Sequence, residues 1–307
     1  MDAVESAVAV ISAVDAGQRA AVAGVLERAA RADGKQAVSE QGRLALRGGQ
    51  RQGVRHLLQH DGSGALVGYA QVDGEGTAEL VVDPDRRGHG HGRALATAAA
   101  EAGAERVWAH GGHPAARRLA GEFGLELSRE LRQLRRGLPV EADVDPVLPP
   151  GVTLRTFVPG QDEDAWLALN AAAFAHHPEQ GSWTRRDLDQ RIAEPWFEPA
   201  GFFLAERDGR LVGFHWTKVE NGLGEVYVVG VAPDEQGSGL GRALTATGLR
   251  YLGGPRGLDT VLLYVDADNP AALRVYEKLG FTVHEVDLMY RRPQTERTPR
   301  ATPPTAP

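Results

Sequence analysis

The residues best suited to chemistry lie in a glycine-rich turn, Gln236-Gly-Ser-Gly-Leu-Gly-Arg242, which follows the apolar segment 225–231. Glycines let a backbone approach a ligand closely, because they carry no side chain and tolerate unusual torsion angles. A helix expected over 239–252 begins in this turn, and the first N–H groups of a helix have no acceptor within it. With the helix dipole they form a site for an anion such as a pyrophosphate, to which Arg242 could add charge.

Three other interpretations compete with a pyrophosphate site. A P-loop ends in Gly-Lys-Ser or Gly-Lys-Thr, and this turn has neither ending. A dinucleotide-binding turn has the spacing G-x-G-x-x-G in the first βαβ unit, whereas Gly237, Gly239 and Gly241 lie deep in the chain with another spacing. A purely structural turn is the third alternative, and it loses force because the turn occurs twice.

The sequence contains a tandem repeat. Pro84–Leu95 and Pro233–Leu244 are identical at eight of twelve positions with an offset of 149. Upstream, Leu66-Val-Gly-Tyr69 matches Leu211-Val-Gly-Phe214, and downstream His113-Pro-Ala-Ala116 matches Asn269-Pro-Ala-Ala272. Three matched segments in the same order indicate that the chain is a duplication.

The repeat predicts two domains in the 307 residues, each large enough for its own core. We expect an N-terminal domain over 1–138, a linker over 139–151 that is rich in proline and acidic residues, and a C-terminal domain over 152–291. The Pro/Thr/Arg-rich tail, 292–307, should be disordered. Each copy alternates helical and strand patterns, so the expected fold class is α/β with a mixed sheet. The clearest elements are strands over 202–207, 211–219, 225–231 and 260–265, and helices over 15–32, 162–174, 239–252 and 270–279.

Composition excludes several function classes. The chain has no cysteine, so disulfides, thiolate metal sites, iron–sulfur clusters and an acyl-cysteine intermediate are impossible. A net charge of −7 argues against a nucleic-acid-binding face. The apolar run Ala7–Val14 is too short to span a bilayer. The adjacent His176 and His177 cannot readily share a metal, so no metal is expected. These features favour a soluble, cytoplasmic protein, expected to be a monomer without membrane or nucleic-acid partners.

A second motif accompanies the glycine turn in the C-terminal copy. Asn269-x-x-Ala272-x-x-x-Tyr276-x-x-x-Gly280-Phe281 follows Gln236-x-x-Gly239-x-Gly241, and the pair resembles the GCN5-related N-acetyltransferases (GNAT). The resemblance implies a splayed central sheet in each domain, with acetyl-CoA as co-substrate between two parted strands. Its pyrophosphate would lie on the glycine turn and its pantetheine along the strand that ends at Val231. The implied coenzyme-binding residues are Val229, Gly230, Val231, Gln236, Gly237, Ser238, Gly239, Leu240, Gly241, Arg242, Asn269, Pro270, Ala271, Ala272, Leu273 and Arg274, and in the first copy Leu80, Val81, Val82, Gly88, His89, Gly90, His91, Gly92 and Arg93.

Two residues of the C-terminal copy are candidates for acid–base chemistry. Glu225 should share one strand face with Tyr227, Val229 and Val231, where its carboxylate could take a proton from an incoming ammonium. The resemblance implies that Tyr276 protonates the departing CoA thiolate. From the residues alone, a solvated Glu225 and a Tyr276 that only packs its helix remain equally open.

The N-terminal copy lacks these groups. By the motif offsets, Ala120 corresponds to Tyr276, His113 to Asn269 and Gly76 to Glu225. We therefore expect a catalytically degenerate first domain that could still bind acetyl-CoA, with chemistry in the second. Since no thiol nucleophile exists, the amine should attack the thioester directly.

The overall layout resembles tandem members of the family that acetylate the cysteinyl amine of a cysteinyl-glucosaminyl-inositol, the last step of mycothiol biosynthesis. The segment His177-Pro-Glu-Gln-Gly-Ser-Trp183 contributes to that resemblance. It implies an acceptor site of Glu40, Glu179, Lys218, Glu225 and Tyr264. Two alternatives stay open: an acetyltransferase for a peptide N-terminus or an aminoglycoside, and a non-catalytic acyl-CoA sensor.

Overall fold

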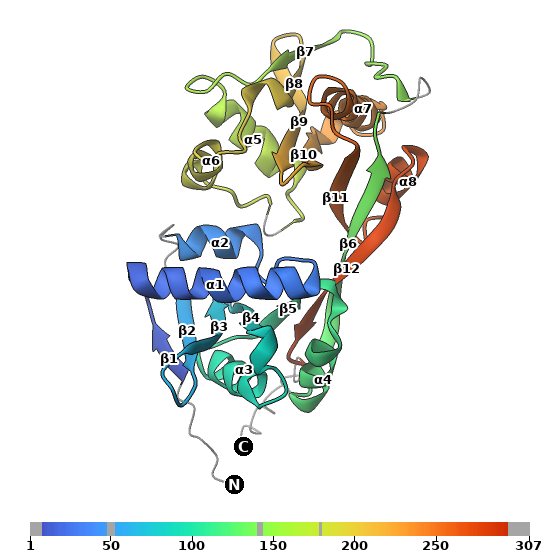
Figure 1. Cartoon of the computed structure of the whole chain (residues 1–307). Helices are drawn as coiled ribbons and strands as arrows, with labels where there is room; N and C mark the ends of the chain where they lie inside the picture. The colour runs from blue at the N-terminus through green and yellow to red at the C-terminus, as the bar shows by residue number, and fades with distance from the viewer. Residues whose placement is uncertain (1–7, 48–52, 140–143, 178–179, 294–307) are drawn as a thin grey trace, which may run out of the picture. The chain divides into compact units, whose positions relative to one another are not determined.

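The computed structural model describes residues 8–47, 53–139, 144–177 and 180–293 of the chain. They form two compact units, one of Met1–Arg129 with Asp287–Pro307 and the other of Glu130–Val286 (Figure 1). We call these unit 1 and unit 2. Among the described residues, no helix combines the length and apolar character needed to cross a bilayer. The tail expected to be disordered lies outside the described residues from 294 onward.

Unit 1 is a mixed sheet with helices on both faces, in the strand order β1-β2-β3-β4-β5-β12. One face packs on the first two helices and the other on α3, because neighbouring residues of a strand point to opposite sides. Tyr69 and Val81 thus contact the core under α1, while Ala70 and Val82 contact the core under α3. The elements are β1 (Val8–Ile11), α1 (Ala16–Asp33), α2 (Glu40–Leu46), β2 (Arg55–His60), β3 (Leu66–Val72), β4 (Thr77–Val82), η1 (Pro84–Arg86), α3 (His91–Glu101), β5 (Arg106–Ala109), η2 (His110–Gly112) and α4 (Pro114–Glu122).

Unit 2 repeats this plan in the strand order β6-β11-β10-β9-β8-β7. Trp166 packs edge-on against Phe214 and Trp216 on one face, and Leu244 and Leu249 lie in the cores of the other face. Its elements are β6 (Glu126–Gly137), β7 (Val152–Thr156), α5 (Glu163–Ala173), α6 (Arg185–Ile192), η4 (Pro199–Gly201), β8 (Phe202–Arg207), β9 (Arg210–Glu220), β10 (Leu223–Val231), η5 (Pro233–Glu235), α7 (Leu240–Gly253), β11 (Thr260–Asp266) and α8 (Pro270–Lys278), and the strand that follows, β12 (Thr282–Arg291), ends in the sheet of unit 1.

The two copies exchange their last strands. Residues 131–137 of β6, at the end of the first repeat, pair antiparallel with β11 of unit 2. Residues 288–291 of β12, at the end of the second repeat, pair antiparallel with β5 of unit 1. The domain boundaries expected from the sequence follow the repeat, whereas the compact units follow these strand pairs.

The central parallel strands part in both units. β10 pairs with β11 at Gly224–Val261 and Glu225–Leu262, and β4 pairs with β5 at Thr77–Arg106 and Ala78–Val107. Beyond these pairs, the described residues form no further ladder between the two strands. The predicted mixed α/β fold, in two tandem copies with a splayed sheet, is confirmed.

Candidate active site

The glycine turn of unit 2 leaves the start of α7 open to a ligand. Gly237 and Gly239 have left-handed backbone angles, with φ of 83° and 89°, which favour glycine. Gly239 caps α7 without a side-chain hydrogen bond, and a Cβ at either glycine would meet nothing within 4 Å. The N–H of Leu240 donates a 3.3 Å hydrogen bond to the Ser238 hydroxyl, and the space beside both glycines gives the turn the geometry of an anion site.

The N-terminal copy keeps the same turn. Gly88 and Gly90 have φ of 80° and 88°, and Gly90 caps α3 as Gly239 caps α7. The nearby Arg87 is already engaged, because its guanidinium donates two hydrogen bonds of 2.7 Å to Asp33. The backbone part of the anion site is thus present in both units.

Glu225 lies where the strands of unit 2 part. It is the last residue of β10 paired with β11, it is partly buried, and it stands opposite Lys218 of β9. Val229–Val231 follow beyond the last pair, so their backbone groups on the β11 side lie outside that ladder. A carboxylate and a stretch of strand outside the β10–β11 ladder therefore adjoin each other.

The register of β10 contains a β-bulge. Val226 pairs with Thr217 and Val228 with Trp216, which leaves Tyr227 as an additional residue. The predicted shared face of Glu225, Tyr227, Val229 and Val231 is therefore wrong, because Tyr227 packs with Val228 against the core under α5, whereas Val229 and Val231 pack against the core under α7.

Two further predicted acceptor residues lie on strands beside Glu225. Lys218 is only 4% exposed, and its Nζ lies 3.2 Å from Glu220 Oε2 and 4.7 Å from the centre of the Trp196 ring. Tyr264 follows Leu262 by two residues on β11 and is 45% exposed. Its hydroxyl accepts a 2.7 Å hydrogen bond from Gln133 Nε2.

Of the other two predicted acceptor residues, one belongs to unit 1 and one lies outside the described residues. Glu40 is the first residue of α2 in unit 1 and is partly buried. Glu179 lies outside the described residues. Of the histidines considered for a metal, His177 places Nε2 3.4 Å from Asp266 Oδ2. In the part of the chain that the structure describes, no three His, Asp or Glu side chains are grouped to hold a metal ion.

Tyr276 is a buried phenol on α8. Burial raises its pKa to about 12, so the hydroxyl is protonated at neutral pH and can act as a donor. Its ring packs edge-on against Phe281 at 5.9 Å. Among the described residues its hydroxyl has no hydrogen-bond partner.

Asn269 has a structural task at the start of the same helix. Its Oδ1 accepts a 3.0 Å hydrogen bond from the N–H of Ala272 and so caps α8. Pro270 follows at the first helical position, which proline favours.

Strand pairing corrects one correspondence between the copies. Ala120 is buried on α4 where Tyr276 lies on α8, and His113 caps α4 as Asn269 caps α8. The partner of Glu225 is Thr77, however, because Thr77 pairs with Arg106 as Glu225 pairs with Leu262. The expected partner, Gly76, is wrong by one residue, since the bulge lengthens β10 relative to β4. Unit 1 therefore lacks both the carboxylate and the phenol.

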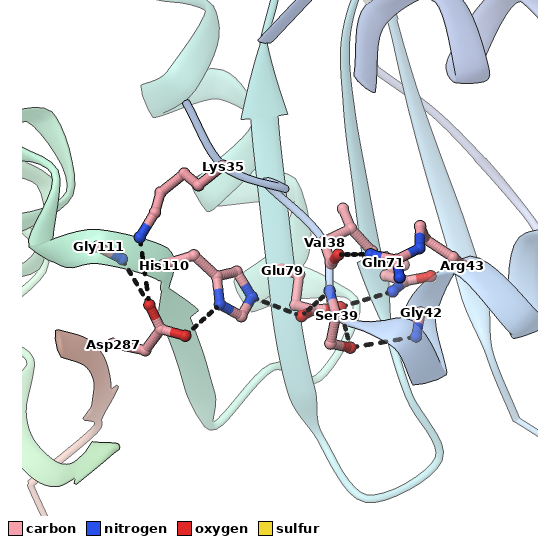
Figure 2. Close-up of polar contacts among 10 residues, drawn as sticks. All are labelled: Lys35, Val38, Ser39, Gly42, Arg43, Gln71, Glu79, His110, Gly111 and Asp287. Atoms are coloured by element: carbon pink, nitrogen blue, oxygen red, sulfur yellow. Dashed lines mark hydrogen bonds and ion pairs between the residues drawn. The ribbon is translucent and has the colours of Figure 1, made fainter. Parts of the chain in front are cut away.

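Unit 1 instead contains a buried charged network that the sequence analysis did not single out (Figure 2). His110 places Nε2 2.8 Å from Glu79 Oε1 and Nδ1 3.1 Å from Asp287 Oδ2. Asp287 also accepts from the N–H of Gly111 at 2.6 Å and lies 3.5 Å from Lys35 Nζ. The network joins β4, the turn η2 that follows β5, the α1–α2 connection and the exchanged strand β12. The one available sequence signal was a glutamate within the apolar strand 77–82.

The charges of this network depend on one another. Burial alone disfavours the imidazolium, but hydrogen bonds to Asp287 and Glu79 raise the pKa of His110 to about 9. Burial likewise opposes ionisation of Glu79, yet hydrogen bonds from His110, Ser39 and Gln71 hold the pKa of that carboxyl below its usual value. At neutral pH the network therefore holds a cationic His110 between two carboxylates.

Comparisons with known proteins match both repeats of the chain. The acetyltransferase (GNAT) family matches residues 28–125 and again residues 166–281. Mycothiol acetyltransferase of Streptomyces avermitilis is 62% identical over 290 residues, which cover 92% of this chain and 94% of that protein. The mycothiol acetyltransferase of Streptomyces griseus is 63% identical with the same coverage, and that of Thermobispora bispora is 55% identical over 90% of this chain and 96% of its own.

Solved structures with the same fold include tandem proteins. A GCN5-related N-acetyltransferase from Sphaerobacter thermophilus has a TM-score of 0.67 at 26% identity, covering 93% of this chain and 96% of that one. A tandem GNAT protein from the clavulanic acid biosynthesis pathway has a TM-score of 0.70 at 19% identity, covering 93% and 98%, which shows the fold alone. With both repeats matched and relatives aligned over nearly the whole chain, the protein belongs to the GNAT family of N-acetyltransferases and, within it, to the mycothiol acetyltransferases.

Proposed function

We propose that the chain transfers the acetyl group of acetyl-CoA to the cysteinyl amine of a cysteinyl-glucosaminyl-inositol, the last step of mycothiol biosynthesis. The observation that carries this proposal is the 62–63% identity to mycothiol acetyltransferases over 92% of the chain. The geometry of unit 2 supports it, because parted strands, an open helix start, a carboxylate and a protonated phenol occur in one unit.

The coenzyme would bind along the glycine turn and the parted strand. The N–H groups at the start of α7 suit its pyrophosphate, with Gln236–Arg242 around it. The pantetheine amides would pair with the backbone of Val229–Val231, which lies outside the β10–β11 ladder. Residues 269–274, at the start of α8, would complete the coenzyme site.

The reaction needs one base, one oxyanion site and one acid. Glu225 would take a proton from the acceptor ammonium, directly or through a water, so that the neutral amine attacks the thioester carbon. Backbone N–H groups of Val229–Val231 would stabilise the oxyanion of the tetrahedral intermediate. When the C–S bond breaks, Tyr276 would donate its proton to the CoA thiolate and recover it from solvent. Direct attack is the simpler path, because the chain has no cysteine to carry an acyl group.

The acceptor would lie beside Glu225. Lys218 stands opposite this carboxylate and Tyr264 lies on the neighbouring strand, so both could bind hydroxyl or carbonyl groups of the pseudodisaccharide. Glu179 would add an acceptor for its hydroxyls.

Unit 1 would be a degenerate copy. Thr77 and Ala120 replace the base and the acid, while Gly88–Arg93 and Leu80–Val82 keep a backbone arrangement suited to acetyl-CoA. Since one chain already contains both copies, we propose that the protein acts as a cytoplasmic monomer on small molecules.

The test is turnover with a panel of amines. Purified protein is incubated with acetyl-CoA and the cysteinyl pseudodisaccharide, a peptide or an aminoglycoside, and CoA is separated by chromatography because the acceptor carries its own thiol. We expect CoA release with the cysteinyl compound. Release only with a peptide or aminoglycoside would refute the acceptor, and coenzyme binding without release in any mixture would indicate a sensor.

A pair of variants tests which unit reacts. Tyr276→Phe should lower kcat at least about 100-fold, in the range of a lost general acid. Ala120→Ser, at the matching position of unit 1, should leave kcat within about twofold. Equal effects would mean that the chemistry is assigned to the wrong unit.

A further inference from the structure

One tyrosine of β10 lies between the proposed base and the segment proposed to bind the coenzyme. Tyr227 is the additional residue of the β10 bulge, with Glu225 before it and Val229–Val231 after it. A bulge bends its strand and redirects the side chains around it. The conformation at Tyr227 therefore sets the spacing between Glu225 and the backbone proposed to bind the thioester.

An arginine of α6 fixes the hydroxyl of this tyrosine. Arg191 Nε donates a 2.7 Å hydrogen bond to the Tyr227 hydroxyl. Its guanidinium lies 3.8 Å from the centre of the Trp183 ring, and its Nη1 donates to the carbonyl of Asp187 at 2.9 Å. Arg191 is only 4% exposed, so stacking and hydrogen bonds together leave its side chain little freedom.

The ring of Tyr227 is enclosed as well. Trp196 and Trp216 pack edge-on against it at 5.0 and 5.3 Å. Lys218 Nζ lies 5.4 Å from its centre, and Lys218 is the residue opposite Glu225. The same ring is thus in contact with the strand position that faces the base.

We propose that Arg191 and Tyr227 are positioning residues for acetyl transfer, with Arg191 fixing Tyr227 and Tyr227 fixing the bulge that aligns Glu225 with Val229–Val231. The inference rests on the proposed function, since it takes Glu225 as the base. Neither residue exchanges a proton in the reaction. Their contribution is geometric, and a displacement of about 1 Å at a reacting group can cost about 100-fold in rate.

The experiment compares Tyr227→Phe and Arg191→Lys in the full-length protein. Tyr227→Phe removes only the hydroxyl, and Arg191→Lys keeps the charge but loses the planar guanidinium. We expect kcat to fall about 10- to 100-fold in both, with KM for acetyl-CoA within about twofold, because the glycine turn is untouched. The acidic limb of the pH profile of kcat/KM should also shift, since Glu225 changes its surroundings. Arg185→Lys, on the same helix at a half-exposed side chain, is the control and should leave all three quantities unchanged.

Two results would overturn the proposal. One is a kcat within twofold of the parent in both variants. The other is a fall in kcat matched by a fall in the folded fraction with an unchanged pH profile, which would mean a structural role only. Glu225→Gln is measured alongside: if it keeps full activity, the proposed base is wrong and this inference falls with it. If Glu225→Gln is inactive while Tyr227→Phe is fully active, only the positioning role is refuted.

Discussion

Replacing His110 with glutamine would remove the cation at the centre of the buried network of unit 1. Glutamine keeps a hydrogen-bonding side chain but carries no charge. Glu79 and Asp287, which both approach the imidazole within 3.1 Å, would then lose their shared counter-charge. A buried carboxylate without its partner is strongly destabilising.

The expected loss of unfolding free energy follows from the pKa of His110. Its pKa is about 9 in the folded protein against an ordinary value of 6.5, and each pKa unit corresponds to 1.36 kcal/mol. The folded state thus binds the proton more tightly than the unfolded state. The resulting stabilisation, on the order of 3 kcal/mol, is fully present below pH 6.5 and is lost as pH rises to about 9.

The assay is urea unfolding between pH 6 and pH 10, followed by hydrogen exchange of the β4 and β5 amides so that unit 1 is observed by itself. We expect His110→Gln to lower the unfolding free energy of unit 1 by about 3 kcal/mol at pH 6, with the difference shrinking toward pH 9. His89→Gln, at an exposed histidine of the same unit, is the control and should change little. A difference that is constant across this pH range would refute the argument that an imidazolium holds the network together.

Two further predictions follow from the backbone and from unit 2. Gly239→Ala places a side chain at a φ of 89°, which costs about 1–2 kcal/mol, so KM for acetyl-CoA should rise about 10-fold. Gly90→Ala, at the matching position of unit 1 with a φ of 88°, should leave steady-state kinetics unchanged. Equal effects of the two alanines on kcat/KM would contradict a single catalytic unit. In unit 2, burial lowers the pKa of His215 to about 4, so the folded state binds this proton less tightly than the unfolded state. Hydrogen exchange from β9, corrected for the intrinsic exchange rate, should therefore accelerate as pH falls from 6.5 toward 4. Exchange from β9 that is independent of pH over this range after that correction would show that His215 contributes nothing to acid stability.

The elements around the candidate site could be predicted because their signals are local. The helix expected over 239–252 is α7 at Leu240–Gly253, and the strand expected over 225–231 is β10 at Leu223–Val231. Glycines with positive φ mark the turn, and an alternating apolar pattern marks the strand. The repeat then placed the same elements in both copies.

The features that escaped prediction depend on partners far away in the chain. The local pattern of β6 or β12 is the same whichever sheet it joins, so the strand exchange leaves no mark on it. The bulge at Tyr227 is a matter of register between β9 and β10, and the alternation of residues 225–231 conceals it. Arg191 reaches Tyr227 from a helix more than thirty residues earlier, a contact that no spacing rule indicates.

The two copies differ in their candidate reactive side chains and in one buried position of the sheet. Thr77 and Ala120 stand where unit 2 has Glu225 and Tyr276, the proposed proton acceptor and donor, but the left-handed glycines of the turn are shared by both units. Glu79 of β4 is a further difference between the copies. It pairs with Gln71 of β3, at the position where the buried Val228 of β10 pairs with Trp216 of β9 in unit 2. A carboxylate at that buried position requires a cation, which His110 supplies, and His110 in turn requires Asp287 of the exchanged strand. The charged network therefore ties unit 1 to the last strand of the second repeat, while the same position of unit 2, Val228, belongs to an aromatic core.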